Sequence, residues 1–408
     1  MKIAVIGSTL SGNKGAAAML ESSIQTIGAR YPEATFTLFS YVPPEIERGQ
    51  NTYKQLTVLK ATPLHLGLVI NPLALAYKLL PPLRGFIRSH SAAIKELAEA
   101  DVLLDQGGIT FVDGREKFLL YNVASILPAL LVGTPVVKCA QALGPFNGRI
   151  NRTAARIFLP RMALIVSRGS VTHGYLAGLG LKNIVAGADY AFLLELTETE
   201  KRAARKHFDP GFFRGSRVVG VSPSVVLKKK AEAAGQDYTG MMAAFIDYLA
   251  GRGYRVLLVP HSARAGTGKT HNNDLPLCRE IYDGIAKPEE CLFIDKELPS
   301  QELRYIIGRC DLFVASRFHA MVSSLAMEVP TLVIGWSHKY KEVLEMFGLE
   351  EWAFGLGELN LEYLERRFEA LEKRQAGVRQ KLAKNLPEVK KRSAIQVEEI
   401  ARRLKASA

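Results

Sequence analysis

The chain has 408 residues, more than one hydrophobic core ordinarily supports, so two domains are expected. Hydrophobic residues make up 48 % and charged residues 23 %, a globular balance, and no apolar run reaches the roughly 18 residues that span a bilayer. The first residues lack the pattern of a secretory signal, and the four scattered cysteines indicate reduced thiols. We therefore expect a cytoplasmic protein.

The net charge of +13 is concentrated near the C-terminus, where residues 366–408 hold 13 Lys/Arg against 5 Asp/Glu. The pattern is helical, and a solvated helix face is its simplest interpretation. The functional alternative is peripheral contact with an anionic membrane at its inner face. Nucleic acid is not an expected partner, because aromatic residues are not interleaved with the basic ones and no recognition motif is present.

Short apolar runs alternate with helical patterns from the start of the chain. In the first half, strands are expected at residues 2–7, 36–40, 101–105, 135–140, 164–167 and 183–186, with a helix at 16–29. After a breaker cluster at 209–211, strands are expected at 217–221, 255–260, 291–294, 312–315 and 331–335. Buried strands separated by helices form parallel sheets through right-handed crossovers.

The expected fold is therefore α/β, with two Rossmann-like doubly wound domains. We place the first domain at residues 1–205 and the second at 206–385, followed by a basic C-terminal helix at 386–408.

Residues 64–87 do not fit this scheme. They are strongly apolar, are broken by Pro72, Pro81 and Pro82, and carry Arg84 with Arg88 just beyond. A buried helix under a neighbouring loop is the simplest interpretation. An interfacial membrane patch or a groove for an acceptor lipid is the alternative.

Two glycine-rich segments resemble phosphate loops but lack required residues. Residues 7–15 (GSTLSGNKG) have no Gly-Lys-Ser/Thr, and residues 263–270 (ARAGTGKT) have Ala263 where the first glycine belongs. A nucleoside-triphosphate hydrolase is therefore not expected. The turn that holds Asn13 and Gly15 nevertheless lies between a strand and a helix, where backbone N–H groups suit an anion or a sugar oxygen. A plain tight turn explains it equally well.

A second loop of interest follows the expected strand at 101–105. Asp105, Gly107 and Gly108 lie at its carboxyl end, where paired glycines let backbone approach a ligand closely. The crevice beyond the strand ends is the usual ligand site in open α/β sheets. A structural turn accounts for the glycines about as well.

The strongest local signal is the segment 311–319 (DLFVASRFH). A strand runs into Arg317 and His319, and a helix of small and apolar residues follows. An arginine fork suits a carboxylate or phosphate, and a histidine beside it can donate or accept a proton near neutral pH. His261 ends another strand and is a second candidate ligand, against the alternative of an ordinary loop histidine. No histidine pair has metal-ligand spacing, so no metal is expected.

These motifs, in this order, resemble the polysaccharide pyruvyl transferase family. The residues that carry the resemblance are the turn at 12–18, residues 100–108, 141–146 (QALGPF), 167–170 (SRGS), 188–192 (ADYAF), 259–261 (VPH) and 316–319 (SRFH). The resemblance implies a GT-B-like arrangement with two Rossmann-like halves facing a cleft. It also implies phosphoenolpyruvate as the donor co-substrate, with no separate cofactor, and a pyruvate ketal on a sugar as the product.

The resemblance further assigns roles to residues of the second half. Arg317 would bind the donor anion and His319 would act as general acid, with His261 and Arg168 as secondary donor contacts. Where many members of the family have an arginine, this chain has Ser222-Pro223-Ser224, so Lys228 is a candidate replacement.

The acceptor is expected on the N-terminal side. It would be a saccharide, lipid-linked or part of a polysaccharide, and its candidate contacts are Asn13, Gly15, Asp105, Gly107 and Gly108. Two other functions stay open: a GT-B glycosyltransferase that uses a nucleotide sugar, and a non-catalytic sugar- or membrane-binding relative.

Overall fold

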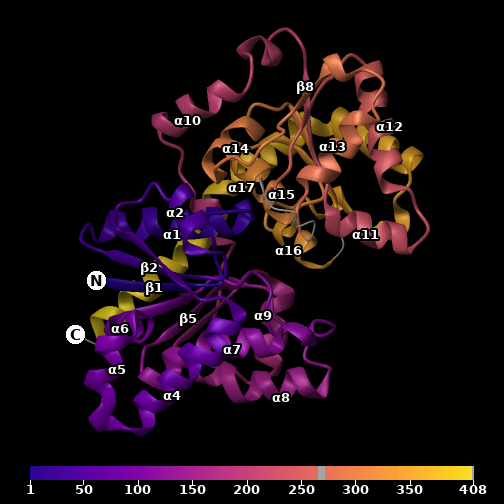
Figure 1. The fold of residues 1–408 in the computed structure, drawn as a ribbon. Helices are drawn as coiled ribbons and strands as arrows, with labels where there is room; N and C mark the ends of the chain where they lie inside the picture. Colours follow the sequence, from indigo (N-terminus) through magenta and orange to yellow (C-terminus); the bar gives the residue numbers. More distant parts are fainter. Residues whose placement is uncertain (265–271, 336, 407–408) are drawn as a thin grey trace. The chain divides into compact units, whose positions relative to one another are not determined.

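The computed structural model describes residues 1–264, 272–335 and 337–406. Its contacts divide the chain into two units (Figure 1). Unit 1 holds Met1–Ser11, Met19–Leu193 and the chain from Lys391 on, and unit 2 holds Gly12–Ala18 and Leu194–Lys390. Gly268, Lys269 and Thr270 of the second phosphate-loop candidate lie outside the described residues.

Unit 1 is built on a seven-stranded sheet of order β3-β2-β1-β4-β5-β6-β7, and all neighbouring strands are parallel. Its strands are β1 (Lys2–Ile6), β2 (Thr35–Ser40), β3 (Leu56–Lys60), β4 (Val102–Asp105), β5 (Val136–Gln141), β6 (Leu164–Ser167) and β7 (Ile184–Ala186). The central strands are buried along their whole length because helices cover both faces, which explains their continuous apolar sequences.

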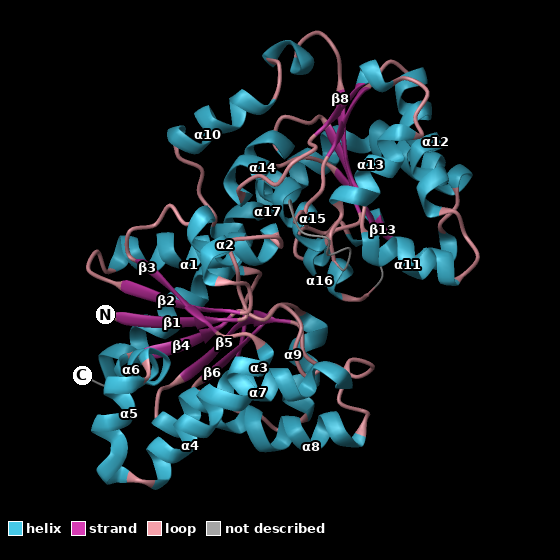
Figure 2. Cartoon of the chain, in the orientation of Figure 1, coloured by secondary structure: helices cyan, strands magenta, loops and turns pink. Residues whose placement is uncertain are grey.

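The main helices of unit 1 are α1 (Lys14–Arg30), α2 (Pro44–Gln50), α3 (Pro63–His65), α4 (Asn71–Leu79), α5 (Arg84–His90), α6 (Ala92–Glu99), α7 (Leu119–Val132), α8 (Arg149–Phe158) and α9 (Ser170–Gly178). The first turn of α1, up to Ala18, belongs to unit 2. Figure 2 shows α1 and α7 on opposite faces of the sheet. Helix α7 ends at Gly133, whose φ of 95° is the left-handed conformation that glycine adopts without a steric penalty.

Unit 2 repeats the plan with a six-stranded parallel sheet of order β10-β9-β8-β11-β12-β13. Its strands are β8 (Val218–Ser222), β9 (Arg255–Leu258), β10 (Cys291–Phe293), β11 (Leu312–Ala315), β12 (Thr331–Ile334) and β13 (Ala353–Phe354). Its helices are α10 (Glu198–Ala204), α11 (Val225–Ala233), α12 (Tyr238–Gly251), α13 (Leu275–Asp283), α14 (Ser300–Ile307), α15 (Phe318–Ala326), α16 (Lys339–Glu345) and α17 (Leu361–Ala406).

Each sheet reverses its strand order at one point, between β1 and β4 in unit 1 and between β8 and β11 in unit 2. Ligands of doubly wound sheets bind outside the carboxyl ends of the strands at such switch points. The loop after β4 begins at Gln106 and the loop after β11 begins at Ser316. Both loops singled out in the sequence therefore lie at a switch point.

The α/β class and the doubly wound parallel sheets are as predicted, and the strands β3 and β13 were not predicted. The sequence-based boundary after residue 205 falls within the segment from Leu194 on that packs with unit 2. The basic helix expected at 386–408 belongs to the longer α17, which begins at Leu361. From Lys391 on, this helix packs with unit 1, where Ser393 Oγ donates to the Asp189 carbonyl at 2.7 Å.

All four cysteines are buried free thiols. Burial raises their pKa, to about 12 in Cys291, so these thiols stay protonated near neutral pH.

Candidate active site

The loop after β11 carries the strongest sequence signal. The buried strand β11 ends at Ala315, and Arg317 is the N-cap residue of α15, with backbone angles of −98° and 131°. His319 is the second residue of that helix. Ser316 is held from two sides, because the Tyr238 hydroxyl lies 3.1 Å from its Oγ and the Tyr340 hydroxyl donates to its backbone carbonyl at 3.1 Å. The sequence places Arg317 and His319 correctly at a strand end and a helix start.

The guanidinium group of Arg317 is held by two residues of the loop before α13. Its Nε donates to Asp274 Oδ2 at 2.7 Å and its Nη2 donates to Asp274 Oδ1 at 2.5 Å. Its Nη1 donates to Asn272 Oδ1 at 2.7 Å. These bonds use three of the five N–H groups of the arginine, and the carboxylate of Asp274 compensates its charge.

Asp274 is fully buried and joins three loops of unit 2. Besides Arg317, its carboxylate accepts the backbone N–H of Ser262 at 3.0 Å, after β9, and of Val225 at 3.0 Å, after β8. A carboxylate with several donors of this kind is well satisfied although it has no access to water. Asp274 thus fixes the loop that carries Arg317 and His319.

The turn that begins α1 packs against His319. A Cβ atom on Gly15 would overlap the imidazole ring of His319, so this close approach requires a glycine. The N–H groups of the turn already have protein partners: Gly15 and Ala16 donate to Asn13 Oδ1 at 3.2 and 3.4 Å, and Lys14 donates to the His261 carbonyl at 3.4 Å. Asn13 therefore caps the helix, and Gly15 makes room for the histidine.

His261 lies buried in the same cluster. Its burial, together with the charges of His319, Arg317 and Arg304, holds the pKa of this imidazole well below its usual value. His261 is therefore uncharged near neutral pH and can accept a hydrogen bond from a hydroxyl group.

A buried ion pair lies beside these histidines. Lys14 has no exposed side-chain surface, and its Nζ is 2.6 Å from Glu297 Oε1. The same carboxylate oxygen accepts the N–H of Gly12 at 2.7 Å. The side chain of Arg264 lies next to Gly12, where an added Cβ atom would stand 2.9 Å from Nε. Lys14, Arg264, Arg304 and Arg317 thus bring four cationic groups to this cluster, in which Lys14 pairs with Glu297 and Arg317 pairs with Asp274.

The sequence did not assign Asp274, Lys14, Glu297 or Arg304 to the site. Asp274 stands in a polar loop with two asparagines, and that composition alone suggests only a turn. Lys14 stood within the singled-out turn but was considered only as part of a phosphate-loop motif. Asp274 and Arg317 are 43 residues apart, and Lys14 and Glu297 are 283 apart, so no local pattern predicts these pairs.

In unit 1 the predicted residues form a separate buried network. The carboxylate of Asp105 pairs with Lys138 and accepts the N–H of Gly107 at 2.9 Å. The Lys138 Nζ also donates to Gln141 Oε1 at 3.2 Å. Gly107 approaches Gly7 so closely that a Cβ on Gly7 would lie 2.6 Å from the Gly107 nitrogen. Gly7 is therefore needed for the close contact between these two turns.

Arg168 is buried next to the same loop. Its Nη1 lies 3.2 Å from Asp189 Oδ2 and 3.7 Å from where a Cβ on Gly108 would stand. The structure thus brings Arg168 and Gly108 together. Lys228 instead forms ion pairs with Glu280 on α13 and, at 3.8 Å, with Glu232 on α11.

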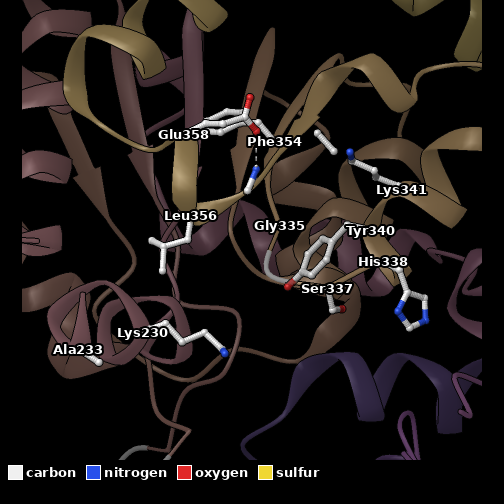
Figure 3. Close-up of a pocket in the computed structure, with 12 residues that line it drawn as sticks. Lys230, Ala233, Gly335, Ser337, His338, Tyr340, Lys341, Phe354, Leu356 and Glu358 are labelled. Carbon is white, nitrogen blue, oxygen red and sulfur yellow. Dashed lines mark hydrogen bonds between the residues drawn. The ribbon is translucent and has the colours of Figure 1, made fainter. Parts of the chain in front are cut away.

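A cavity of about 710 Å³ lies at the carboxyl ends of β12 and β13 (Figure 3). Its lining includes Lys230 from α11, Lys341 from α16 and the N-cap residue of α16, His338. Leu356 and Glu358 also line it, from the 3-10 turn Leu356–Glu358. Its volume lies in the range of small-molecule sites. The side chain of Tyr340 connects it with the site, because Tyr340 lines the cavity and bonds the carbonyl of Ser316.

Two Rossmann-like units with polar loops at their switch points define a GT-B-like α/β protein. UDP-GlcNAc 2-epimerase from Neisseria meningitidis, solved with UDP-GlcNAc bound, is similar over 98% of this chain and 100% of its own, with a TM-score of 0.64 and 13% identity. A glycosyltransferase from Rickettsia africae is similar over 97% and 98%, with a TM-score of 0.54 and 11% identity. At these identities the likeness concerns the fold.

The chain belongs to the polysaccharide pyruvyl transferase family, whose model matches residues 13–338. The matched region includes Lys14, Asp274, Arg317 and His319. Among curated proteins, the amylovoran biosynthesis protein AmsJ from Erwinia amylovora is 23% identical over 372 residues, covering 86% of this chain and 88% of the relative. The resemblance seen in the sequence is thereby confirmed, and the chain is placed among the transferases of polysaccharide biosynthesis.

Proposed function

We propose that the protein transfers the pyruvyl group of phosphoenolpyruvate to a saccharide and forms a pyruvate ketal with release of phosphate. The observation that carries the proposal is the contact of His319 with the Gly15 turn, beside the uncharged His261 and the anchored Arg317. A proton donor (His319), a neutral imidazole that can accept a hydrogen bond (His261) and cationic side chains are thus close together at the switch point of unit 2.

The cationic cluster suits the donor. Phosphoenolpyruvate is a small polyanion, and this cluster holds four cationic side chains, of which Lys14 and Arg317 pair with Glu297 and Asp274. The N-terminus of α15 adds a further positive potential. Because Asp274 compensates much of the charge of Arg317, we assign donor binding to the cluster as a whole, Arg317 included. Arg168, in unit 1, stays a further candidate.

The chemistry requires one proton donor and two hydroxyl groups. Proton transfer from His319 to C3 of the donor makes the methyl group and leaves C2 electron-poor. One sugar hydroxyl adds to C2, the bond from C2 to the phosphate oxygen breaks with its electron pair on phosphate, and the second hydroxyl closes the ketal. One hydroxyl proton restores His319 and the other leaves with phosphate. The reaction so written needs no cofactor.

We assign to His261 the role of accepting a hydrogen bond from the attacking sugar hydroxyl. A neutral imidazole can orient an attacking hydroxyl, whereas a charged one would only donate. For the saccharide we retain Asn13, Gly15, Asp105, Gly107 and Gly108 as candidate contacts. The family and the amylovoran relative support a polysaccharide as the source of the acceptor sugar. A lipid-linked saccharide is the alternative form of the acceptor.

The test is calorimetric titration of phosphoenolpyruvate, followed by a phosphate-release assay with saccharide acceptors. His319→Ala should bind the donor within about threefold of the unchanged protein and release no phosphate above background. Arg317→Lys keeps the charge but loses the fork, and should weaken donor binding by about tenfold or more. Arg279→Ala, at an exposed ion pair with Asp295, is the matched control and should change neither property.

Other outcomes would change the assignment. Binding of a nucleotide sugar in place of phosphoenolpyruvate would indicate a GT-B glycosyltransferase, a reading supported by the UDP-GlcNAc-bound epimerase of the same fold. Binding of neither donor, with or without saccharide present, would indicate a non-catalytic relative.

A further inference from the structure

The apolar segment of unit 1 that the sequence singled out forms a helical hairpin on the surface. One continuous helical stretch runs through α3, the π-helical turn Leu66–Ile70 and α4, and a 3-10 turn at Pro81–Leu83 leads into α5. Leu66, Ile70 and Ala74 form its buried stripe, each at most 1 % exposed. Their four-residue spacing puts them on one face of the helix, which anchors the hairpin to the core of unit 1.

The opposite face is apolar as well. Of the 14 large hydrophobic side chains exposed in the described residues, eight belong to this hairpin, so the exposure is concentrated there. They are Leu64 (75 %), Leu68 (74 %), Val69 (39 %), Leu75 (47 %), Leu79 (64 %), Leu80 (46 %), Leu83 (45 %) and Phe86 (62 %). A helix on a protein surface ordinarily turns polar residues to water. A large contiguous apolar face of this kind marks a surface that contacts something else.

The charges of the hairpin indicate what that contact is. Residues 61–94 contain no Asp or Glu, whereas Lys78 and Arg84 are exposed beside the leucines. Arg88 is exposed as well and pairs with Glu99, just beyond the hairpin. The guanidinium group of Arg84 is held on the hairpin by Tyr77. Its Nε donates to the Tyr77 carbonyl at 3.0 Å, and the group lies 5.2 Å from the centre of the Tyr77 ring. An apolar face edged by basic residues matches the acyl and headgroup layers of an anionic bilayer.

We propose that residues 64–88 form a monotopic membrane-binding surface for anionic lipid bilayers. Among the described residues no helix is long and apolar enough to cross a membrane, so the hairpin would lie in the interface. A second copy of the chain fits less well, because a symmetric contact would bring two basic edges together with no acidic residue of the hairpin between them. The inference does not depend on the reaction proposed above.

The test is flotation of the full chain with two kinds of vesicle. One is phosphatidylcholine alone, and the other is phosphatidylcholine with about 30 % phosphatidylglycerol, which gives a surface potential of about −30 mV. We expect binding to the anionic vesicles. Leu68→Gln/Leu79→Gln should lower the partition coefficient about tenfold or more, since two anchoring side chains are lost. Lys78→Gln/Arg84→Gln should lower it about 25-fold, at roughly fivefold for each charge, and only at low salt.

The matched control is Ile46→Gln/Ile150→Gln, which changes two exposed apolar side chains outside the hairpin, 42 % and 69 % exposed. This variant should bind like the unchanged protein, and circular dichroism should show that all variants are folded. Equal loss of binding in the control would overturn the hairpin as the contact surface. Absence of binding to anionic vesicles at low salt would overturn the proposal. So would a dimer in solution that Leu68→Gln/Leu79→Gln dissociates, because the face would then join two copies.

Discussion

The guanidinium of Arg317 lies fork to fork against the carboxylate of Asp274, with Nε 2.7 Å from Oδ2 and Nη2 2.5 Å from Oδ1. The carboxylate is fully buried, and the arginine side chain is 15 % exposed. From the sequence, Arg317 is expected to bind an anionic ligand. In the folded chain it also holds the loop before α13 against the start of α15.

The first prediction concerns this pair. Asp274→Asn keeps the shape of the side chain but leaves Arg317 without its counter-charge, so we expect unfolding free energy to fall by about 3–5 kcal/mol. Asp295→Asn is the matched control, because its carboxylate is 58 % exposed and 3.5 Å from Arg279, and it should cost less than about 1 kcal/mol. Urea unfolding measures both. Equal losses in the two variants would show that the buried pair adds no more than a surface one.

The second prediction uses the contact between Gly15 and His319. In Gly15→Ala the added methyl group overlaps the imidazole, so we expect a loss of about 1–3 kcal/mol from overpacking and loss of transferase activity as the ring is displaced. Gly15→Ala/His319→Ala removes the obstacle and should recover most of the stability without the activity.

Gly28→Ala is the control on the same helix, since nothing lies within 4 Å of a Cβ at that position. It should gain about 0.5–1 kcal/mol through helix propensity. If the double variant is no more stable than Gly15→Ala, the two residues are not in the contact described.

The third prediction is a pH dependence of stability. The pKa of His261 is well below 6.5 in the folded chain because the ring is buried near cationic groups. Below about pH 6.5 the unfolded chain therefore binds a proton that the folded chain does not, and stability falls as the pH falls. The slope from this one group approaches about 1.4 kcal/mol per pH unit.

His261→Gln removes this contribution while it keeps the backbone carbonyl that accepts the Lys14 N–H. Plots of unfolding free energy against pH for the two proteins should run parallel above pH 7 and diverge below about 6.5, with the shallower slope in the variant. Identical slopes down to pH 5 would mean that His261 is protonated as readily in the folded chain as in the unfolded one.

The strands and the two loops at the switch points could be predicted because they rest on local patterns. Runs such as LFVA at 312–315 are apolar throughout, and the loop after each run is set by the end of the strand. The two-residue strand β13 has no such pattern, and its place depends on pairing with β12.

The chemistry of the site was less accessible from sequence. A single lysine gives no local sign that it will be buried. Lys14 at the start of α1 and Lys138 within β5 are nevertheless both fully buried, and each is paired with a carboxylate elsewhere in the chain. Burial of such a pair is decided by tertiary packing, which juxtaposes residues 283 positions apart in the case of Lys14 and Glu297. Lys228 was expected to bind the donor because this chain lacks an arginine that many family members have nearby. In the structure, Lys228 pairs with Glu280 on α13.

The last prediction compares one substitution in two ion pairs. Lys138→Met leaves the carboxylate of Asp105 in the core of unit 1 without its cation, and should cost about 3–5 kcal/mol of unfolding free energy. Lys228→Met breaks pairs whose carboxylates, Glu280 and Glu232, are each 52 % exposed, and should cost at most about 1 kcal/mol. Urea unfolding separates the two expectations.

Lys228→Met also tests the donor role inferred for that lysine from the sequence. Because its ammonium group pairs with Glu280 on α13, we expect phosphoenolpyruvate binding within about twofold of the unchanged protein in calorimetry. A loss of about tenfold or more, with stability unaffected, would mean that Lys228 leaves Glu280 to meet the donor, since a surface pair is weak enough to be exchanged for a polyanion.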